Sequence, residues 1–330
     1  MSPDSDNVYD LVIIGSGAAG LSAAIYAGRY LMKVLVVEGV FGGETAVAGT
    51  IWNYPGVKGA DGFDLMQTMK EQAKEVGAKF VNGKVSAVIN ENNCYTVAIG
   101  DKQFFTKTVL FAQGSERRRL GLPNEKELTN KGVHFCTTCD GPLYGGKTVA
   151  MVGGGDASVK GVNLLLNYAS KIYFIVRGSQ MRAEPINVSD MEKNGHGKVE
   201  ILYDTQVEEI HGSALLEKIV ISKEHNGSKE LVLDGLFVEI GANPDVALAQ
   251  SVGVTLDGLG YVAVDNFMQT NVSGIYAAGD AVNHFGGFKQ TVTAAALGAV
   301  AATSAYNYHK KHGNLCEVHW KTSADLAESK

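Results

Sequence analysis

The sequence feature that most constrains the fold is a glycine-rich turn near the start of the chain. Six consecutive residues form this turn: Gly15, Ser16, Gly17, Ala18, Ala19 and Gly20. An uninterrupted apolar run, residues 9–14, precedes the turn, and residues 21–30 after it show the pattern of a helix. A second apolar run, residues 33–38, ends on Glu38. This order predicts a strand–helix–strand unit that binds a dinucleotide and whose sheet is covered on both faces.

Each glycine of this turn has its own role in such a unit. Gly15 makes the tight turn, Gly17 lets a pyrophosphate approach the backbone, and Gly20 lets the helix pack against the strand. The N-terminus of the helix faces the phosphates, because its backbone N–H groups are unpaired. The carboxylate of Glu38 can accept hydrogen bonds from the adenosine ribose. We therefore expect a bound dinucleotide at this unit.

A second unit of the same kind lies in the middle of the chain. Residues 147–152 are its first predicted strand, residues 159–168 its helix and residues 171–176 its second strand. Its turn supplies five candidate nucleotide contacts: Gly153, Gly155, Asp156, Ala157 and Ser158. Two units predict two dinucleotides, one held permanently and one exchanged.

The residues after the second unit indicate which nucleotide it prefers. An acid there favours a free ribose 2′-hydroxyl, whereas arginines favour a 2′-phosphate. The position that matches the acid of the first unit is Val176, so the acid is missing. Arg177 and Arg182 remain as candidate phosphate ligands, or are solvated surface groups.

Between the two units lie two cysteines, Cys136 and Cys139, with Asp140 directly behind them. This spacing lets the sulfurs form and break a disulfide, and it can lower the pKa of one thiol so that the thiolate attacks. Asp140 can carry a proton to or from the neighbouring thiol. The pattern therefore predicts a redox-active pair.

The alternative for these cysteines is one half of a zinc site. A closed zinc site usually needs four Cys or His ligands. Cys94 and Cys316 are isolated in the sequence, and His134 cannot complete the set alone. Redox chemistry is favoured, because the pair directly precedes a nucleotide-binding pattern.

The rest of the chain alternates predicted strands, turns and helices. Helices are expected over residues 61–76 and from Lys289, Gln290 and Thr291 to about residue 308. Single strands are expected at 79–89, 95–99, 108–114, 201–210, 218–222, 230–233, 235–241, 260–264 and 274–280. The last of these ends on Asp280, whose carboxylate can hold ribityl or ribose hydroxyls of a cofactor. The loops at residues 42–45 and 53–56 can cover a flat ligand or be ordinary surface turns.

Composition limits the class of protein. The 330 residues suit two domains, and a hydrophobic content of 45% supplies their cores. A net charge of −6 and the absence of a basic stripe argue against nucleic acid. No apolar run is long enough to span a membrane, and the polar start, residues 1–7, does not read as a signal peptide. Four cysteines do not make a disulfide scaffold, so we expect a cytoplasmic protein.

From about residue 9 to residue 308 the chain resembles the low-molecular-weight thioredoxin reductases. The resemblance rests on both glycine turns, on the cysteine pair with Asp140, and on two later motifs, Gly279-Asp280 and Lys289-Gln290-Thr291. It implies an α/β fold of two Rossmann-like domains, one inserted in the other. Residues 1–117 and 245–330 would form the FAD domain, and residues 118–244 the inserted domain for NAD(P)H and the disulfide. A homodimer with one FAD per chain is also implied.

The resemblance implies two sets of cofactor contacts. The FAD set is Gly15, Ser16, Gly17, Ala18, Ala19, Gly20, Glu38, Gly42, Gly43, Glu44, Thr45, Asn53, Val85, Ala112, Gly114, Gly279, Asp280, Lys289, Gln290 and Thr291. The NAD(P)H set is Gly153, Gly155, Asp156, Ala157, Ser158, Arg177, Arg182 and Gly241.

The resemblance also implies a mechanism. Hydride from the donor reaches the flavin, electrons pass to the disulfide, and the dithiol reduces thioredoxin. Cys139 would lie against the flavin, Cys136 would attack the partner and Asp140 would carry the proton. The inserted domain must swing, because the nicotinamide and the disulfide take turns at the flavin.

The chain departs from the pattern of that family in three places. Its phosphate-binding stretch, His-Arg-Arg-x-x-x-Arg, reads here as Val176, Arg177, Gly178 and, after three residues, Arg182. Each lost charge-assisted contact costs about 1.5–3 kcal/mol, so NADPH, NADH, ferredoxin or another donor are all open. The others are glutamate for glutamine at position 44 and glutamine for threonine at position 113. Alternative functions are the reduction of a small disulfide, the oxidation of a dithiol, and a flavin-binding redox sensor or electron carrier.

Overall fold

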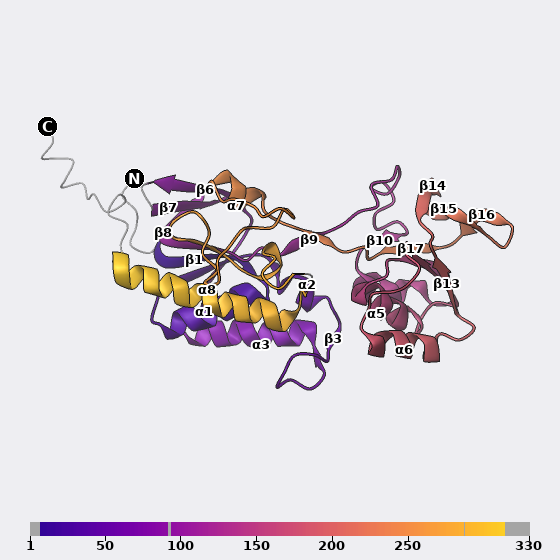
Figure 1. Ribbon diagram of the computed structural model, residues 1–330, viewed down its shortest axis with the longest axis horizontal. Helices are drawn as coiled ribbons and strands as arrows, with labels where there is room; N and C mark the ends of the chain where they lie inside the picture. The colour runs from indigo at the N-terminus through magenta and orange to yellow at the C-terminus, as the bar shows by residue number, and fades with distance from the viewer. Residues whose placement is uncertain (1–6, 92–93, 287, 314–330) are drawn as a thin grey trace, which may run out of the picture. The chain divides into compact units, whose positions relative to one another are not determined.

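The computed structural model describes residues 7–91, 94–286 and 288–313. Residues 1–6 of the polar start, the polar tail after residue 313 and Cys316 therefore lie outside the described residues. The chain forms two compact units (Figure 1). Unit one comprises Met1–Ser115 and Pro244–Lys330, and unit two comprises Glu116–Asn243. The chain leaves unit one through β9 (Ser115–Arg117) and returns through β18 (Ala242–Pro244), and these two strands pair with each other.

Unit one is built on a seven-stranded sheet. Six strands follow the order β5-β2-β1-β8-β7-β6, and β19 pairs with β8. Their bounds are β1 Val8–Ser16, β2 Val34–Phe41, β5 Lys79–Asn82, β6 Val85–Glu91, β7 Cys94–Ile99, β8 Lys102–Phe111 and β19 Ile275–Ala277. The strands β5, β2, β1, β8 and β19 run parallel, and β7 and β6 extend the sheet as an antiparallel hairpin. The apolar run of β1 is fully buried, as a strand covered on both faces must be.

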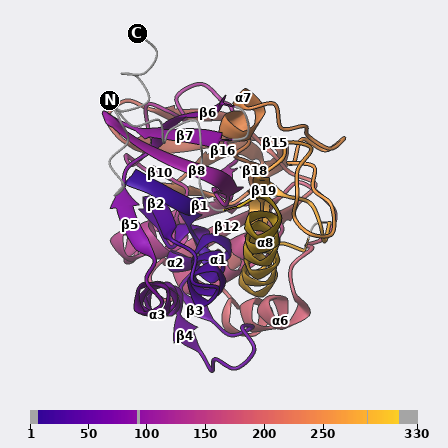
Figure 2. The same ribbon diagram turned by 90° about the vertical axis from the view of Figure 1, so that its left-hand side faces the viewer.

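Three long helices lie together on the sheet of unit one (Figure 2). They are α1 (Ala18–Arg29), α3 (Gly62–Glu75) and α8 (Thr291–His312). Helices α1 and α8 approach so closely that only glycine fits at position 298: a Cβ there would lie 2.0 Å from the Ala19 carbonyl oxygen. The remaining short elements of the unit are α2 (Gly43–Ala46), β3 (Thr50–Ile51), β4 (Ala60–Asp61), α7 (Ala247–Ser251) and η3 (Gly279–Ala281).

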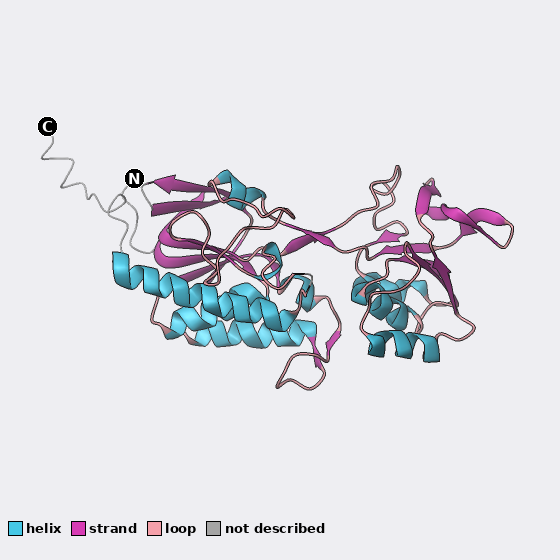
Figure 3. Ribbon diagram, viewed as in Figure 1, coloured by secondary structure: helices cyan, strands magenta, loops and turns pink. Residues whose placement is uncertain are grey.

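Unit two contains a five-stranded parallel sheet and a smaller antiparallel one. The parallel order is β10-β17-β11-β12-β13, with bounds Val133–His134, Gly235–Val238, Thr148–Val152, Lys171–Val176 and Val199–Tyr203. The antiparallel sheet consists of β14 (Val207–Gly212), β15 (Leu216–His225) and β16 (Ser228–Val232). Helices α5 (Asp156–Leu165) and α6 (Pro185–Asn194) gather on one side of the strands (Figures 1 and 3). The predicted α/β fold of two Rossmann-like domains, one inserted in the other, is confirmed.

Some predicted strands were wrong in extent. The single strand expected at 79–89 is two strands, because Gly83 turns the chain at a φ of +147°. These two strands, β5 and β6, end up at opposite edges of the sheet. The strand expected at 201–210 is likewise divided into β13 and β14, with Asp204 at a φ of +53° between them. Residues 260–264 form no strand; Val262 makes only isolated bridges. Helix α6 was not predicted.

No helix among the described residues is both long enough and apolar enough to cross a bilayer.

Candidate active site

The two cysteines form a disulfide at the start of a short helix. Cys136 is the N-cap of α4 (Thr137–Asp140), its Cα lies 5.3 Å from that of Cys139, and their sulfurs are bonded. The Cys139 backbone N–H donates to Cys136 Sγ over 3.2 Å. Strand β10 ends at His134, just before the pair, and runs parallel to β17. The pair therefore lies at the carboxyl edge of the sheet, where parallel α/β folds place their sites.

A buried histidine lies beside this helix. The His134 Nδ1 atom is 3.0 Å from Asp140 Oδ2, and the Nε2 atom is 2.6 Å from the Tyr144 hydroxyl. Tyr144 ends η2 (Gly141–Tyr144), the helical turn that follows α4. The histidine ring stacks on Phe237 of β17, with 5.3 Å between the ring centroids. The sequence had suggested His134 only as an incomplete zinc ligand, and no group of three or more possible ligands is arranged for a metal within the described residues.

Burial controls the protonation of this cluster. It lowers the pKa of His134, and the neighbouring Asp140 carboxylate opposes that effect only in part. Burial also raises the pKa of Tyr144 to about 12, with the charges of Asp140 and Asp234 adding to it. At neutral pH the imidazole and the phenol are therefore both uncharged.

The N-terminal end of α4 is tied to the last strand of the same sheet. The Glu239 carboxylate accepts hydrogen bonds from Arg117 Nη1 at 3.0 Å and from Thr137 Oγ1 at 3.4 Å. Glu239 directly follows β17, and its backbone oxygen lies against the second glycine turn. This contact ties Thr137, one of the two residues between the cysteines, to the strand end beside the second glycine turn. The sequence pattern gave no signal for it, because the three residues are distant in the chain.

The first glycine turn has the shape that its sequence predicts. A Cβ on Gly15 would lie 2.3 Å from the Ala112 carbonyl oxygen, and one on Gly20 would lie 2.0 Å from the Gly15 carbonyl oxygen. Gly17 is the N-cap of α1, no side chain caps that helix end, and the space above Gly17 is open. An open approach to uncapped N–H groups fits a pyrophosphate.

Glu38 is buried within β2, which continues to Phe41, and its carboxylate is already paired. Both carboxylate oxygens contact Lys70 Nζ of α3, at 2.7 and 2.9 Å. A carboxylate has about four acceptor positions, so capacity remains for ribose hydroxyls. Lys70 was not predicted, because no local pattern connects it to β2. Nearby, Ser16 Oγ donates to the Val40 carbonyl oxygen over 3.3 Å.

The predicted loops meet the N-terminus of α8. Thr45 Oγ1 lies 3.1 Å from Thr291 Oγ1, and Asn53 Nδ2 donates to Gln290 Oε1 over 2.9 Å. Gly42 and Gly43 adopt φ values of +68° and +55°, and they carry the chain into the short α2, which contains Glu44. The structure thus brings three separate stretches of unit one together at one helix end.

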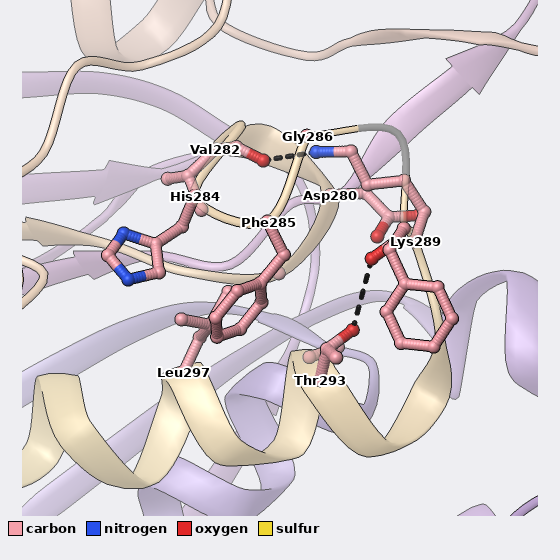
Figure 4. A pocket seen from close by; sticks show the side chains of 11 residues that line it. Asp280, Val282, His284, Phe285, Gly286, Lys289, Thr293 and Leu297 are labelled. Carbon is pink, nitrogen blue, oxygen red and sulfur yellow. Dashed lines mark hydrogen bonds between the residues drawn. The ribbon is translucent and has the colours of Figure 1, made fainter.

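Asp280 and Lys289 both line a small pocket (Figure 4). Burial raises the pKa of Asp280, the nearby Lys289 opposes this, and Glu44 adds to it. Burial likewise lowers the pKa of Lys289, which Asp280 and Asp257 oppose. Lys289 Nζ donates a hydrogen bond to the Val282 carbonyl oxygen, which holds the lysine side chain in the pocket lining. Gly279, the first residue of η3, directly precedes Asp280.

Four further residues of unit one belong to the expected flavin-binding region and the segment beside it. Ala112 follows β8 and meets Gly15, whereas Val85 is buried at the start of β6. Gly114 adopts a φ of +76° where the chain approaches the crossing between the units. Within the described structure, the buried Oε1 of Gln113 has no hydrogen-bond partner, although its Nε2 donates to Asp245 over 3.3 Å.

The second glycine turn is also shaped for close approach. A Cβ on Gly153 would lie 2.3 Å from the Glu239 carbonyl oxygen, whereas Gly155, the N-cap of α5, has open space. The Asp156 carboxylate accepts the Glu184 backbone N–H at 2.6 Å, and Ser158 Oγ donates to the Gly155 carbonyl oxygen. Ala157 is exposed in the first turn of the helix.

The two candidate arginines lie on the exposed loop beside this turn. Arg177 and Arg182 are both exposed, and the Arg182 backbone N–H donates to the Gly154 carbonyl oxygen over 2.7 Å. Gly241 has a φ of +96° and open space around it. The loop therefore lies next to the glycine turn through its backbone, while both guanidinium groups remain in solvent.

Comparisons with known proteins agree with this arrangement. The profile of the pyridine nucleotide-disulphide oxidoreductase family matches residues 9–298. A thioredoxin reductase from Peptoclostridium acidaminophilum is 37% identical over 312 residues, which cover 92% of this chain and 98% of the relative. The solved Lactococcus lactis thioredoxin reductase (FR conformation) is 31% identical with a TM-score of 0.86, covering 92% of this chain and 99% of the other. A solved ferredoxin-flavin thioredoxin reductase from Clostridium acetobutylicum is 30% identical with a TM-score of 0.50, covering 92% and 99%. This chain therefore belongs to the thioredoxin reductases of the pyridine nucleotide-disulphide oxidoreductase family.

Proposed function

We propose that this protein reduces the disulfide of thioredoxin with its Cys136–Cys139 pair, using FAD bound in unit one. The observation that carries this proposal is the disulfide at the carboxyl edge of the unit-two sheet, in a chain that belongs to the thioredoxin reductases. When bound, FAD supplies the two electrons that convert this disulfide into a dithiol. Thioredoxin has a potential of about −270 mV, within reach of a nicotinamide-level donor.

The residues of unit one support FAD in its expected site. We propose that the turn from Gly15 to Gly20 holds the pyrophosphate against the N-terminus of α1, with Glu38 on the adenosine ribose. Asp280 would bind the ribityl chain, and the N-terminus of α8 at Thr291 would lie at the pyrimidine edge, where its partial positive charge favours a reduced flavin. The steric need for glycine at the turn and the open space above Gly17 support this placement.

In the proposed mechanism the dithiol acts through two sulfurs and one carboxyl group. The Cys136 thiolate attacks the thioredoxin disulfide and forms a mixed disulfide, and Asp140 protonates the thioredoxin sulfur that leaves. The Cys139 thiol then returns its proton to Asp140 and attacks the Cys136 sulfur. This closes the Cys136–Cys139 disulfide and releases the second thioredoxin sulfur as a thiolate.

The test of this function is substitution of the attacking cysteine in the holoprotein. Cys136→Ser is expected to abolish thioredoxin reduction while FAD stays bound, since the attacking sulfur is lost. Thr138→Ala, at the exposed residue between the cysteines, is the matched control and is expected to retain activity. Full turnover of thioredoxin by Cys136→Ser would exclude the proposal. Turnover of small disulfides but not thioredoxin would assign the alternative function.

For the electron donor we propose weak use of NADPH. Only Arg177 and Arg182 remain as basic phosphate ligands in the stretch, and both side chains are exposed. NADH and ferredoxin are the competing donors, and one relative, from Clostridium acetobutylicum, is a ferredoxin-flavin thioredoxin reductase. Anaerobic bleaching of the flavin by the three donors, compared side by side, identifies the donor. Micromolar affinity for NADPH would show that two arginines suffice.

We also propose that the protein is a cytoplasmic homodimer that meets thioredoxin without a membrane or nucleic acid. This proposal rests on the resemblance to the low-molecular-weight thioredoxin reductases, which implies a homodimer with one FAD per chain. Light scattering of the purified holoprotein gives the mass of the assembly. A monomer at micromolar concentration would contradict the proposed dimer.

A further inference from the structure

Beside the redox pair lies a buried imidazole that the mechanism above does not use. His134 is 3% exposed and is the last residue of β10. It stacks on Phe237 and meets the edge of Tyr144, with 5.4 Å between the latter ring centroids. Burying a polar ring costs free energy unless its nitrogens find partners. The contacts of both nitrogens therefore bear on its role.

The two nitrogens of His134 have different partners. Nε2 lies 2.6 Å from the Tyr144 hydroxyl, which is a short hydrogen bond. Nδ1 lies 3.0 Å from Asp140 Oδ2, but the N–H direction is not aligned, so Nδ1 has no regular hydrogen bond in the described structure. An ionised carboxylate can only accept, so the network assigns the hydrogen to Nδ1. The Tyr144 hydroxyl then donates to Nε2.

Three neighbouring elements pack against this ring. Asp140 faces it from α4, Tyr144 from η2, and β17 contributes the uncharged Phe237. Asp234, just before β17, acts on Tyr144. Burial keeps the pKa of His134 low and that of Tyr144 high, so both are neutral over the working range of a thiol. A neutral Nδ1–H group therefore lies 3.0 Å from the carboxyl group that follows Cys139 in the chain, within reach of a hydrogen bond after a small rotation of either side chain.

We propose that His134, held by Tyr144, is a positioning residue that directs Asp140 to protonate the thiolate leaving from a disulfide substrate. The inference rests on the proposed function in one respect, the role of Asp140 as proton carrier. In many enzymes a catalytic acid or base is held in position by a third group that contacts it on the side away from the substrate.

The protons and bonds of the step balance. The dithiol begins as a Cys136 thiolate and a Cys139 thiol, with Asp140 protonated. Attack on a disulfide RS–SR forms the Cys136–S–SR bond, and the RS⁻ that leaves takes the Asp140 proton. The Asp140 carboxylate then accepts from His134 Nδ1–H until it regains a proton from the Cys139 thiol. The Cys139 thiolate closes the intramolecular disulfide and releases the second RS⁻.

The test uses the reduced holoprotein and two disulfides with different leaving groups. DTNB releases an aromatic thiolate of low pKa that needs no proton, whereas hydroxyethyl disulfide releases an alkyl thiolate that does. We expect His134→Phe to slow the reaction with hydroxyethyl disulfide about tenfold, the worth of one charge-assisted contact. Its rate with DTNB should stay within about twofold. Tyr144→Phe, which keeps the ring, should act in the same direction.

Two further measurements separate positioning from a structural role. His134→Asn, whose amide N–H replaces Nδ1–H, should restore part of the rate with hydroxyethyl disulfide. The ratio of the rate with hydroxyethyl disulfide to the rate with DTNB should be highest in the wild type, intermediate in His134→Asn and lowest in His134→Phe. Tyr168→Phe, between α5 and β12, is the control for a tyrosine hydroxyl elsewhere in unit two.

The inference is overturned if both variants slow the two disulfides equally, or slow neither. If His134→Phe does not fold, judged by flavin absorbance and thermal unfolding, Tyr144→Phe alone decides the matter. Failure of the proposed function has a different signature. A wild-type protein that does not reduce thioredoxin, yet shows the leaving-group difference between its variants, would reject thioredoxin as substrate and support the role of His134.

Discussion

At the scale of single residues, Gly17 and Gly20 show that two glycines of one motif serve different needs. An added methyl group at Gly20 would lie 2.0 Å from the Gly15 carbonyl oxygen, which is backbone and cannot move away cheaply. The same group at Gly17 would meet nothing closer than the Gly42 carbonyl oxygen at 3.9 Å, and Gly17 has an ordinary φ of −75°. Gly20 is therefore needed for the fold, and Gly17 for the ligand.

This difference predicts opposite phenotypes for two alanine substitutions. Gly20→Ala should destabilise unit one by about 3 kcal/mol, because helix α1 must move off its strand. That corresponds to a Tm roughly 6–12 °C lower for a domain of this size. Gly17→Ala should keep the Tm of the apoprotein but weaken FAD at least about tenfold, since its methyl group occupies the space of the pyrophosphate.

Calorimetry of the apoproteins and flavin titration distinguish the two effects. A Gly17→Ala protein that binds FAD as tightly as the wild type would contradict the placement of the pyrophosphate. A Gly20→Ala protein with an unchanged Tm would contradict the assignment of this glycine to packing.

At the scale of elements, the C-terminal end of α8 is fixed to the sheet by a buried imidazole. His309 Nε2 lies 2.6 Å from the Asp10 carbonyl oxygen and 3.2 Å from Thr108 Oγ1. Burial lowers the pKa of His309, and the Asp10 carbonyl opposes this only in part. These contacts tie the C-terminal end of α8 to β1 and β8. The proposed flavin-binding end of α8 is its other, N-terminal end.

Unit one should therefore lose stability in mild acid. The unfolded histidine has a pKa of about 6.5, so as the pH falls the unfolded chain takes up this proton before the folded chain does. The contribution is fully present above about pH 6.5 and is lost progressively below it. His309→Gln should flatten this part of the curve of unfolding free energy against pH.

The matched control for this prediction is His312→Gln, an exposed histidine on the same last turn. Urea unfolding of unit one between about pH 5 and pH 8 measures both slopes. An equal change of slope in the two variants would show that burial of His309 is not the cause.

The elements also show where sequence patterns succeed and where they fail. The strand–turn–helix order around Gly15 was predicted correctly, because its signals are local: apolar run, glycines, helix pattern. The prediction of one strand over residues 79–89 was wrong, because Gly83 turns the chain in the middle of this range. The residues before and after Gly83 each have a strand-like pattern, so the sequence does not show that they belong to different strands. Pairing decides the division: β6 joins its neighbour β7 in a hairpin, whereas β5 joins β2, which lies about 40 residues earlier in the chain and leaves no local signal.

At the scale of the whole molecule, the same limit applies to the candidate site. Cys136, Cys139 and Asp140 were predictable, because the pair and its acid are adjacent. The packing of His134 on Phe237 and the contact of Lys70 with Glu38 were not, since each depends on which strand or helix lies alongside. Family resemblance adds which residues are expected to bind and react, and the structure adds the contacts that hold them in place.

The core residues also divide by unit. One set of buried clusters is formed only by residues of unit one, including those of β1, β8 and α8. The other set is formed only by residues of unit two, including those of β11, β12 and β17. Each unit therefore contains a hydrophobic core of its own, which is the requirement for folding alone.

This division predicts that a fragment of residues 116–243 folds by itself, whereas a fragment of residues 1–115 does not. The first contains every strand of its parallel sheet, and its termini are adjacent, because β9 pairs with β18. The second lacks β19, which completes the sheet beside β8, and α8, which covers α1. Burial of α1 would then be lost on one side, and exposed apolar surface favours unfolding or aggregation. Cooperative urea unfolding of the 116–243 fragment, with dispersed amide signals in its NMR spectrum, is the expected result, and a fragment 1–115 that also unfolds cooperatively would contradict the requirement for the C-terminal segment.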